Sequence, residues 1–278
     1  MPPVPARGAR FKSASMSDLA QPQMILNRVV SNPPWEDPRT HRLPGISPLD
    51  MADWLWVLDS YPAQMAERER LLAEVTPRVH ALPEAALPAA QELYDIVLAQ
   101  LADRGDFRLE GEVMRCPDSR LVRLDRDAPL LTLGRLVQED LCLLEKPPGG
   151  TEHLLTAAVL CFPASWTLSE KLGRPMVAIH RPVAEYDAEL ARRVQRLLDG
   201  VRPGRPLWRA NRHHYRDAAL FHPLREGEVR AEAENEAPFL RSERQCLLRL
   251  PETGAVAFSI HTMVMRRSDL PTGAAVAH

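Results

Sequence analysis

The chain has 278 residues, enough for one large domain or two small ones. Its formal net charge is only −2 and we expect no basic stripe or arginine-rich helix, so the sequence argues against a nucleic-acid partner. There is no apolar run of 18 residues for a membrane span, and no apolar core follows the positively charged N-terminus as in a secretory signal. We therefore expect a cytoplasmic protein.

The four cysteines are scattered, with no Cys-x-x-Cys pair that would indicate a zinc site. Most lie in apolar context, so the sequence predicts buried free thiols and not a disulfide framework. Residues 1–40 are rich in proline and lack periodicity, which predicts a loose, partly disordered arm. Residues 41–270 are then expected to form a single folded domain.

The first part of this domain has helical patterns. Asp50 is a good N-cap, and the apolar spacing after it predicts a helix over 51–75, interrupted near Pro62. A second helix is expected over 84–101, with Pro88 in its first turn. The N-terminal part is therefore predicted to be a helical extension of a strand-rich body.

From Phe107 onward the pattern favours strands. Two short strands are expected within 107–125, a helix over about 131–140, and strands over 140–146 and 153–162. Further predicted elements are a short helix over 168–172, a strand-like stretch over 176–179, an amphipathic helix over 186–198 and a strand over 207–211. The whole pattern predicts an α+β protein with an antiparallel sheet and packed helices.

The last two strands form a predicted hairpin closed by the turn Pro251-Glu252-Thr253-Gly254. The simplest register pairs Leu250 with Ala255. Arg241, Glu243 and Gln245 then share a face with apolar residues of the last strand. Charged groups on an apolar face are costly unless paired or used, so we expect a site here.

Three histidine candidates are weighed for metal binding. His180 follows a strand-like tetrad and precedes a proline, and an imidazole at such a strand end can ligate a metal; a hydrogen-bonded structural histidine is the alternative. The adjacent His213 and His214 would point to opposite faces of a strand, so a surface loop is favoured for them. His261 is expected to be half-exposed near Arg244 and competes with His180 as a ligand.

Arg209 and Asn211 are spaced by two residues and share one strand face. A guanidinium and an amide at this spacing can grip a carboxylate, such as a cofactor propionate. An exposed strand face with no ligand is the alternative. Trp166, Ser165 and Lys171 could cap a pocket, although a core tryptophan fits the pattern equally well.

Several segments, in order, resemble the α-subunit family of haem-dependent oxidative N-demethylases. The matching segments are Gly45 to Leu72, Leu136 to Leu144, Cys161 to Trp166, Glu170 to Pro175, Ile179 to Val183, Arg209-Ala210-Asn211, and Arg241 to Pro251. Each is short, and their ordered occurrence over about residues 40–267 makes the resemblance specific.

The resemblance implies a PAS-like sheet that carries haem b and oxygen-dependent demethylation of a small alkylamine such as dimethylamine. It also implies a separate NADPH-linked reductase with flavin and iron–sulfur centres, for which this chain has no visible motif. His180 is the predicted iron ligand, and Arg209, Asn211 and Arg241 are the other predicted cofactor-binding residues. Glu243 and Arg244 are the predicted catalytic residues.

The chain departs from the family pattern at a few positions. Arg212 replaces the usual aromatic residue after Arg-x-Asn, Ala184 replaces a proline, and His261-Thr262-Met263 stands where Arg-Thr-Tyr is usual. A non-catalytic haem- or ligand-binding PAS-like protein, such as a sensor, therefore stays open as the alternative to an enzyme.

Overall fold

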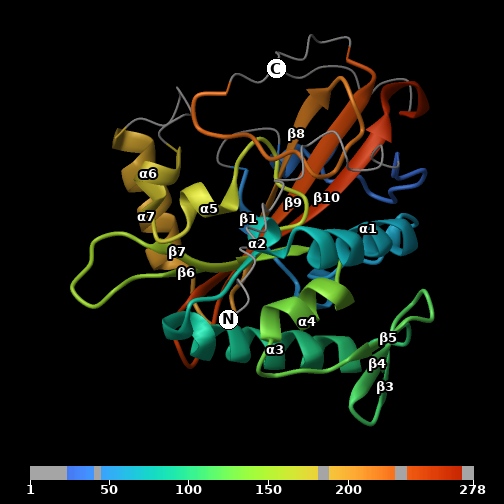
Figure 1. The fold of residues 1–278 in the computed structure, drawn as a ribbon. Coiled ribbons are helices and arrows are strands. Elements are labelled where there is room, and N and C mark those ends of the chain that lie inside the picture. The colour runs from blue at the N-terminus through green and yellow to red at the C-terminus, as the bar shows by residue number, and fades with distance from the viewer. Residues whose placement is uncertain (1–23, 41–44, 181–187, 229–236, 271–278) are drawn as a thin grey trace, which may run out of the picture.

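The structure is a computed structural model that describes residues 24–40, 45–180, 188–228 and 237–270. Its largest element is an antiparallel sheet of seven strands, accompanied by a separate sheet of three strands and by helices (Figure 1). This confirms the predicted α+β class. The narrower PAS-like assignment stays a prediction.

The main sheet is built from long central strands and very short outer ones. In spatial order its strands are β1 (Ser47–Pro48), β8 (Leu207–Tyr215), β9 (Phe239–Arg249), β10 (Val256–Arg266), β6 (Asp140–Glu145), β7 (Leu154–Val159) and β2 (His80–Ala81). The small sheet is β3 (Arg108–Glu110), β4 (Val113–Arg115) and β5 (Leu121–Arg123), so the predicted pair of strands is in fact three.

The helices are mostly short. They are α1 (Tyr61–Glu74), α2 (Thr76–Val79), α3 (Leu87–Ala102), α4 (Pro129–Leu136), α5 (Leu168–Lys171), α6 (Met176–His180) and α7 (Ala188–Gly200). Single 3-10 turns are η2 (Pro38–Thr40), η3 (Met51–Asp53), η4 (Glu84–Ala86) and η5 (Arg267–Asp269). Among the described residues, none of the helices has the length and apolar character needed to cross a membrane.

Two local expectations are corrected at the N-terminal helices. Asp50 does cap a helix, but only the 3-10 turn η3, where its carboxylate accepts the amide of Ala52 at 3.0 Å. Pro62 does not interrupt a long helix; it lies in the first turn of α1, where a missing N–H costs nothing. Pro88 lies in the first turn of α3 as predicted.

The predicted register of the β9–β10 hairpin is confirmed. The amide of Leu250 donates to the carbonyl of Ala255 at 2.9 Å, and Gly254 has a φ of 73°, which favours glycine. Glu92 of α3 holds the turn, because its carboxylate accepts the amides of Glu252 at 2.7 Å and Thr253 at 2.8 Å.

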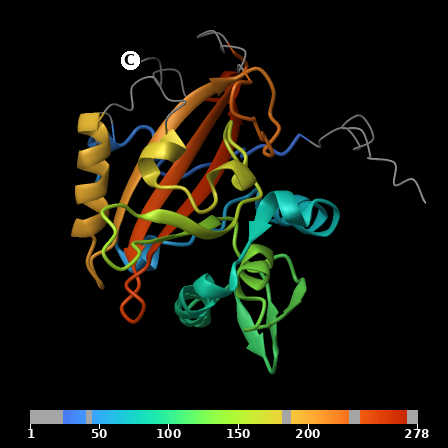
Figure 2. The same ribbon diagram turned by 60° about the vertical axis from the view of Figure 1, so that its left-hand side comes forward.

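The hairpin divides the main sheet into two faces with different coverings. On one face, here called the α7 face, Cys142, Leu144, Val256 and Ile260 form an apolar cluster with Leu168 of α5 and Leu198 of α7. The other, here called the Trp54 face, packs against Trp54 and Trp56. Figure 2 shows α7 on the outside of the molecule beside the sheet, with α1, α3 and α4 on the far side of the sheet.

Buried polar groups fix α1 against the sheet. Arg68 of α1 is fully buried and donates to Asp140 of β6 at 2.7 Å, while Asp140 also accepts the amides of Cys161 and Phe162. Gln64 of α1 donates to the carbonyl of Thr262 at 3.0 Å, beyond the end of the β10–β6 pairing. Helix α1 therefore contacts β10 along the part of the strand that is not paired with β6.

The N-terminal arm is only partly described, since residues 1–23 lie outside the described residues. Several residues of its described part are buried, and others, such as Val29, are exposed. The amide of Asn27 donates to the carbonyl of Val264 at 2.8 Å, and Ile25 and Trp35 are buried. Residues 25–35 therefore belong to the folded body.

All four cysteines are free and buried, as predicted. The helix predicted over about 131–140 is α4, which ends at Leu136, and Asp140 already belongs to β6. The stretch 176–179 is helix α6 and not a strand, and His213 and His214 lie within strand β8 and not in a loop.

Candidate functional site

Four predicted site residues gather on the α7 face of β8 and β9. Asn211 lies opposite Glu243 and Arg209 lies opposite Gln245 in the register. Because side chains alternate along a strand, Arg209, Asn211, Glu243 and Arg241 all point to the same face. The structure therefore brings together the residues expected to bind a cofactor carboxylate.

Glu243 lies at the centre of this group. Its carboxylate accepts hydrogen bonds from the side-chain amides of Asn211 at 3.2 Å and Gln245 at 3.1 Å, and forms an ion pair with Arg241 at 3.5 Å. Asn211 also accepts the backbone amide of Glu243 at 3.0 Å. Glu243 is only 7% exposed, and these contacts satisfy its buried carboxylate and fix it in position.

Arg209 is the member of the group with no such contacts. The described part of the chain offers it no hydrogen bond or ion pair, and its Nε atom is buried without a partner. Burial lowers the pKa of Arg209, an effect that the nearby charge of Glu243 opposes. Arg209 is half-buried, and its buried Nε without a hydrogen bond is costly, so this position suits an anionic ligand.

Arg241 is largely used by the fold. Its guanidinium donates to the carbonyl of Phe162 at 2.6 Å and to that of Leu220 at 3.0 Å, and it lies over the ring of Tyr215. Only its Nε atom is buried without a hydrogen bond in the described residues. Arg241 therefore ties the segment after β7 to β9 and has little donor capacity left for a ligand.

Thr262 is a site residue that the sequence analysis does not single out. It pairs with Glu243 across the hairpin, so its side chain is on the α7 face. It is fully buried, and its hydroxyl has no hydrogen bond within the described residues. The sequence feature that could have identified Thr262 is its match to the threonine in the Arg-Thr-Tyr stretch that is usual in the family.

The polar group borders an apolar floor. Ile260, Phe258 and Leu247 continue the α7 face next to it, and Trp166, Met176 and Ile179 pack against the same cluster. Met176 and Ile179 belong to α6, whose last residue is His180; the side chain of His180 lies outside the described residues. Lys171 of α5 donates to the carbonyl of Ile179 at 2.8 Å and so fixes α6 beside the floor.

This face has the chemistry that haem would require. A haem has a flat apolar body and two propionate carboxylates at one edge, and the face joins apolar side chains to an arginine without a partner. The described residues hold no group of three or more metal-ligating side chains. Haem does not need one, because a single axial nitrogen can hold its iron.

Arg244 lies on the Trp54 face, opposite to Glu243. Its guanidinium donates to the carbonyls of Trp54 at 2.9 Å and Asp53 at 2.6 Å, and it lies between the rings of Trp56 and Trp208. Only 1% of it is exposed. The structure therefore does not bring together the two predicted catalytic residues, and it gives Arg244 a full set of structural contacts.

His261 is also on the Trp54 face and is fully buried, so the expectation of a half-exposed position is wrong. Its Nδ1 atom is 2.9 Å from the carboxylate of Glu139, and its ring meets that of Trp56 edge-on. His261 Nε2 and the second carboxylate oxygen of Glu139 are buried without partners among the described residues. Glu139 also accepts the amide of Trp56 at 3.0 Å, which joins three segments of the chain.

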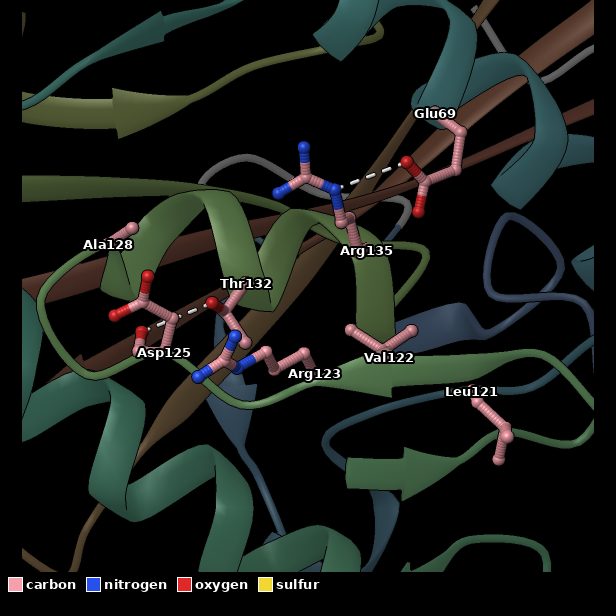
Figure 3. A pocket seen from close by; sticks show the side chains of 8 residues that line it. All are labelled: Glu69, Leu121, Val122, Arg123, Asp125, Ala128, Thr132 and Arg135. Atoms are coloured by element: carbon pink, nitrogen blue, oxygen red, sulfur yellow. Dashed lines mark hydrogen bonds and ion pairs between the residues drawn. The ribbon is translucent and has the colours of Figure 1, made fainter. Parts of the chain in front are cut away.

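A surface hollow of about 390 Å³ lies elsewhere (Figure 3). It is lined by Glu69, Leu121, Val122, Arg123, Asp125, Ala128, Thr132 and Arg135. Arg135 forms an ion pair with Glu69 at 3.1 Å, and the Thr132 hydroxyl donates to the carbonyl of Asp125. None of the predicted site residues lines this hollow, and its own charged groups are paired or exposed.

A comparison with known protein families gives a match over most of the chain. A family model described as "haem-dependent oxidative N-demethylase, alpha subunit-like" covers residues 45–278. No curated protein matches the chain. The matched range contains both faces of the main sheet and every residue of the polar group on the α7 face.

The buried Glu139–His261 pair predicts a specific dependence of stability on pH. Burial raises the pKa of Glu139, but the charge and hydrogen bond of His261 and the amide of Trp56 prevail and hold it below its ordinary value of 4.5. A carboxyl whose pKa is lowered by folding contributes stability above its unfolded pKa and loses it as pH falls through the folded value. Glu139→Gln should therefore lower the free energy of unfolding at pH 7.

The difference between wild type and Glu139→Gln should shrink as the pH falls below about 4.5. Urea unfolding at a series of pH values measures it. Glu74→Gln, an exposed carboxylate of α1 in an ion pair with Arg70, is the control and should give a difference near zero at each pH. A difference for Glu139→Gln that stays constant down to about pH 3 would contradict the charged pair.

Proposed function

Because the chain belongs to the haem-dependent oxidative N-demethylase, alpha subunit-like family, we propose that it binds haem b on the α7 face and removes a methyl group from a small alkylamine. The substrate class is dimethylamine-like, and the oxidant is molecular oxygen. The observation that carries the proposal is Arg209, a half-buried cation without a partner in the described residues, beside an apolar floor.

In this proposal Arg209 donates to a haem propionate, and Asn211 supplies a second donor on the same strand face. Ile260, Phe258 and Leu247 contact the flat body of the cofactor and exclude water. His180, at the end of α6, is the residue that would hold the iron, and His261 is the alternative. The burial of His261 in contact with Glu139 and Trp56 favours His180 for this role.

Glu243 is the proposed amine-binding residue. A small secondary amine is cationic near neutral pH, and a carboxylate fixed by Asn211 and Gln245 can pair with it. The hydroxyl of Thr262 has no hydrogen bond among the described residues. It lies across the hairpin from Glu243 and can accept a hydrogen bond from the amine or donate one to it. Both groups would hold the nitrogen while the methyl group faces the cofactor.

The overall reaction takes the amine, oxygen, a pair of electrons and a pair of protons to the demethylated amine, formaldehyde and water. Haem, when bound, supplies the centre at which oxygen is activated. The electrons come from a separate subunit, consistent with a family description that names an alpha subunit. We propose an NADPH-linked reductase with flavin and iron–sulfur centres for that role.

Arg209→Met tests the propionate contact. The substitution removes a half-buried charge without a partner, so the free energy of unfolding without haem should stay the same or rise. Haemin affinity should fall about tenfold or more through loss of a charge-assisted hydrogen bond. Thermal unfolding and haemin titration measure the two effects.

Arg241→Met is the matched control, because Arg241 holds two backbone carbonyls. It should lower stability with and without haemin. If Arg209→Met instead lowers stability without haemin and leaves haemin affinity unchanged, Arg209 is a structural residue.

The identity of the iron ligand is tested by spectra of protein reconstituted with haemin. The wild type should give a sharp Soret band, and His180→Ala should broaden or abolish it. His261→Ala should lower stability, because it leaves Glu139 without its partner, and keep the band. The opposite pattern would transfer the role to His261.

The activity itself is tested with haem-loaded protein, NADPH, a ferredoxin–reductase system and a panel of methylamines. Formaldehyde should appear only when oxygen, protein and amine are all present. Glu243→Gln should raise KM for the amine about tenfold or more, through the lost charge pair. Tight haemin binding without turnover or an amine-induced spectral change would favour the non-catalytic binding protein.

A further inference from the structure

The outer side of α7 and the turn after it form an exposed basic surface. Its members are Arg192, Arg193, Arg196, Arg202 and Arg205, all exposed, and they are here called the α7 arginines. The expected absence of a basic stripe or arginine-rich helix is therefore wrong. The five arginines lie within 14 residues of a chain whose net charge is −2.

The α7 arginines form no ion pair in the described part of the chain. None of them has a hydrogen bond or ion pair there through its side chain, and the acidic residues of this stretch are Glu189 and Asp199. Asp199 is already engaged by Lys146 at 2.9 Å. The surface therefore keeps most of its positive charge.

Contacts within α7 account for only part of this arrangement, because Glu189, three and four residues before Arg192 and Arg193, offsets only part of their repulsion. Arg192 and Arg196 are four residues apart and Arg193 and Arg196 are three apart, spacings at which like charges destabilise a helix. The inner side of α7 supplies its stability through Ala191, Val194 and Leu198, which pack inward. Exposed like charges that cost stability are typical of a surface that meets an opposite charge.

The position of α7 indicates what this partner does. The helix covers the α7 face, on which Arg209 and the apolar floor lie, and its outer side faces away from the sheet (Figure 2). A helix is about 10 Å across, so a protein docked on its outer side is one helix thickness from that face. Redox partners form small, transient interfaces in which complementary charge sets the association rate.

We propose that the α7 arginines are the docking surface for an acidic iron–sulfur protein that delivers electrons to the cofactor on the α7 face. This inference rests on the proposed function, because that function requires an external electron donor. It adds the place of docking and the charge of the donor. Arginine suits the role, since its fork of donors meets carboxylates in pairs.

The test compares two variants of equal charge. Arg192→Glu/Arg193→Glu/Arg196→Glu changes the net charge by three times −2, from −2 to −8. The control Arg108→Glu/Arg115→Glu/Arg123→Glu makes the same change on the exposed arginines of the three-stranded sheet, away from α7. Both sets are exposed, and the ion pairs that the control loses, those of Arg108 and Arg115 with Glu110, are exposed pairs that contribute little, so both variants should fold, which circular dichroism verifies.

The probe is a plant-type [2Fe–2S] ferredoxin, an acidic iron–sulfur protein. Surface plasmon resonance gives its association rate constant with the full chain, with and without haemin. At an ionic strength of about 0.05 M the α7 variant should associate at least about tenfold more slowly than wild type, and the control much less so. The difference in association rate between wild type and the α7 variant should disappear at an ionic strength of about 0.5 M, where the charges are screened.

Three results overturn the inference: equal losses in both variants, no binding of ferredoxin to wild type at low salt, or binding of duplex DNA or anionic vesicles through the α7 arginines in place of ferredoxin. The readout is separate from catalysis. Loss of ferredoxin binding only in the α7 variant, in a protein that forms no formaldehyde, would uphold the docking surface and reject the proposed reaction. Formaldehyde formation with equal losses in both variants would do the reverse.

Discussion

The alternation of side chains along β9 and β10 is the constraint on which the rest of the structure depends. One register places Arg241 and Glu243 on the α7 face and sends Arg244 and His261 to the Trp54 face. A slip of one residue would exchange the two sets and leave every charge on the wrong side. The turn at Pro251–Gly254 and the carboxylate of Glu92 fix this register from one end of the hairpin.

The two faces solve the problem of buried charge in different ways. On the Trp54 face each cation or imidazole has a protein partner: Arg244 has backbone carbonyls and two tryptophan rings, and His261 has Glu139, although His261 Nε2 and one oxygen of Glu139 have no hydrogen bond among the described residues. On the α7 face Glu243 is satisfied, but Arg209 and Thr262 have unmet polar atoms in the described residues. Since Arg209 is a cation that no residue of the described chain pairs with, the second face is the one expected to receive an anionic ligand.

Much of this arrangement can be predicted from sequence, because it depends on short-range chemistry. The hairpin turn, the alternation on β8 and β9 and the proline positions in α1 and α3 are local signals, and the gathering of Arg209, Asn211, Arg241 and Glu243 results from strand pairing. The helix α6 escapes prediction because a run of four apolar residues fits a strand and a buried helix equally well. His213 and His214 are predicted in a loop because the polar residues there lack the apolar alternation that would indicate that β8 continues.

The contacts that sequence could not reveal are those between distant segments. Glu139 and His261 are 122 residues apart, and no local sequence pattern indicates that their side chains are in contact. The same holds for the burial of Arg244 by η3 and for the exposure of the α7 arginines, since helix periodicity shows which residues share a side but not which side is covered. Local rules thus assign residues to faces, and only packing decides which face is closed.

The two faces are also linked through β10. His261 and Thr262 are neighbours, so the side chain anchored by Glu139 on the Trp54 face sets the backbone that presents Thr262 to the α7 face. Gln64 holds the carbonyl of Thr262 from α1, and Gln138 in turn donates to Gln64. The segment 138–140 therefore supports the strand with Gln138 and Glu139, and Asp140 holds the turn after β7. Changes in this segment should reach the α7 face through the position of β10, without touching a ligand there.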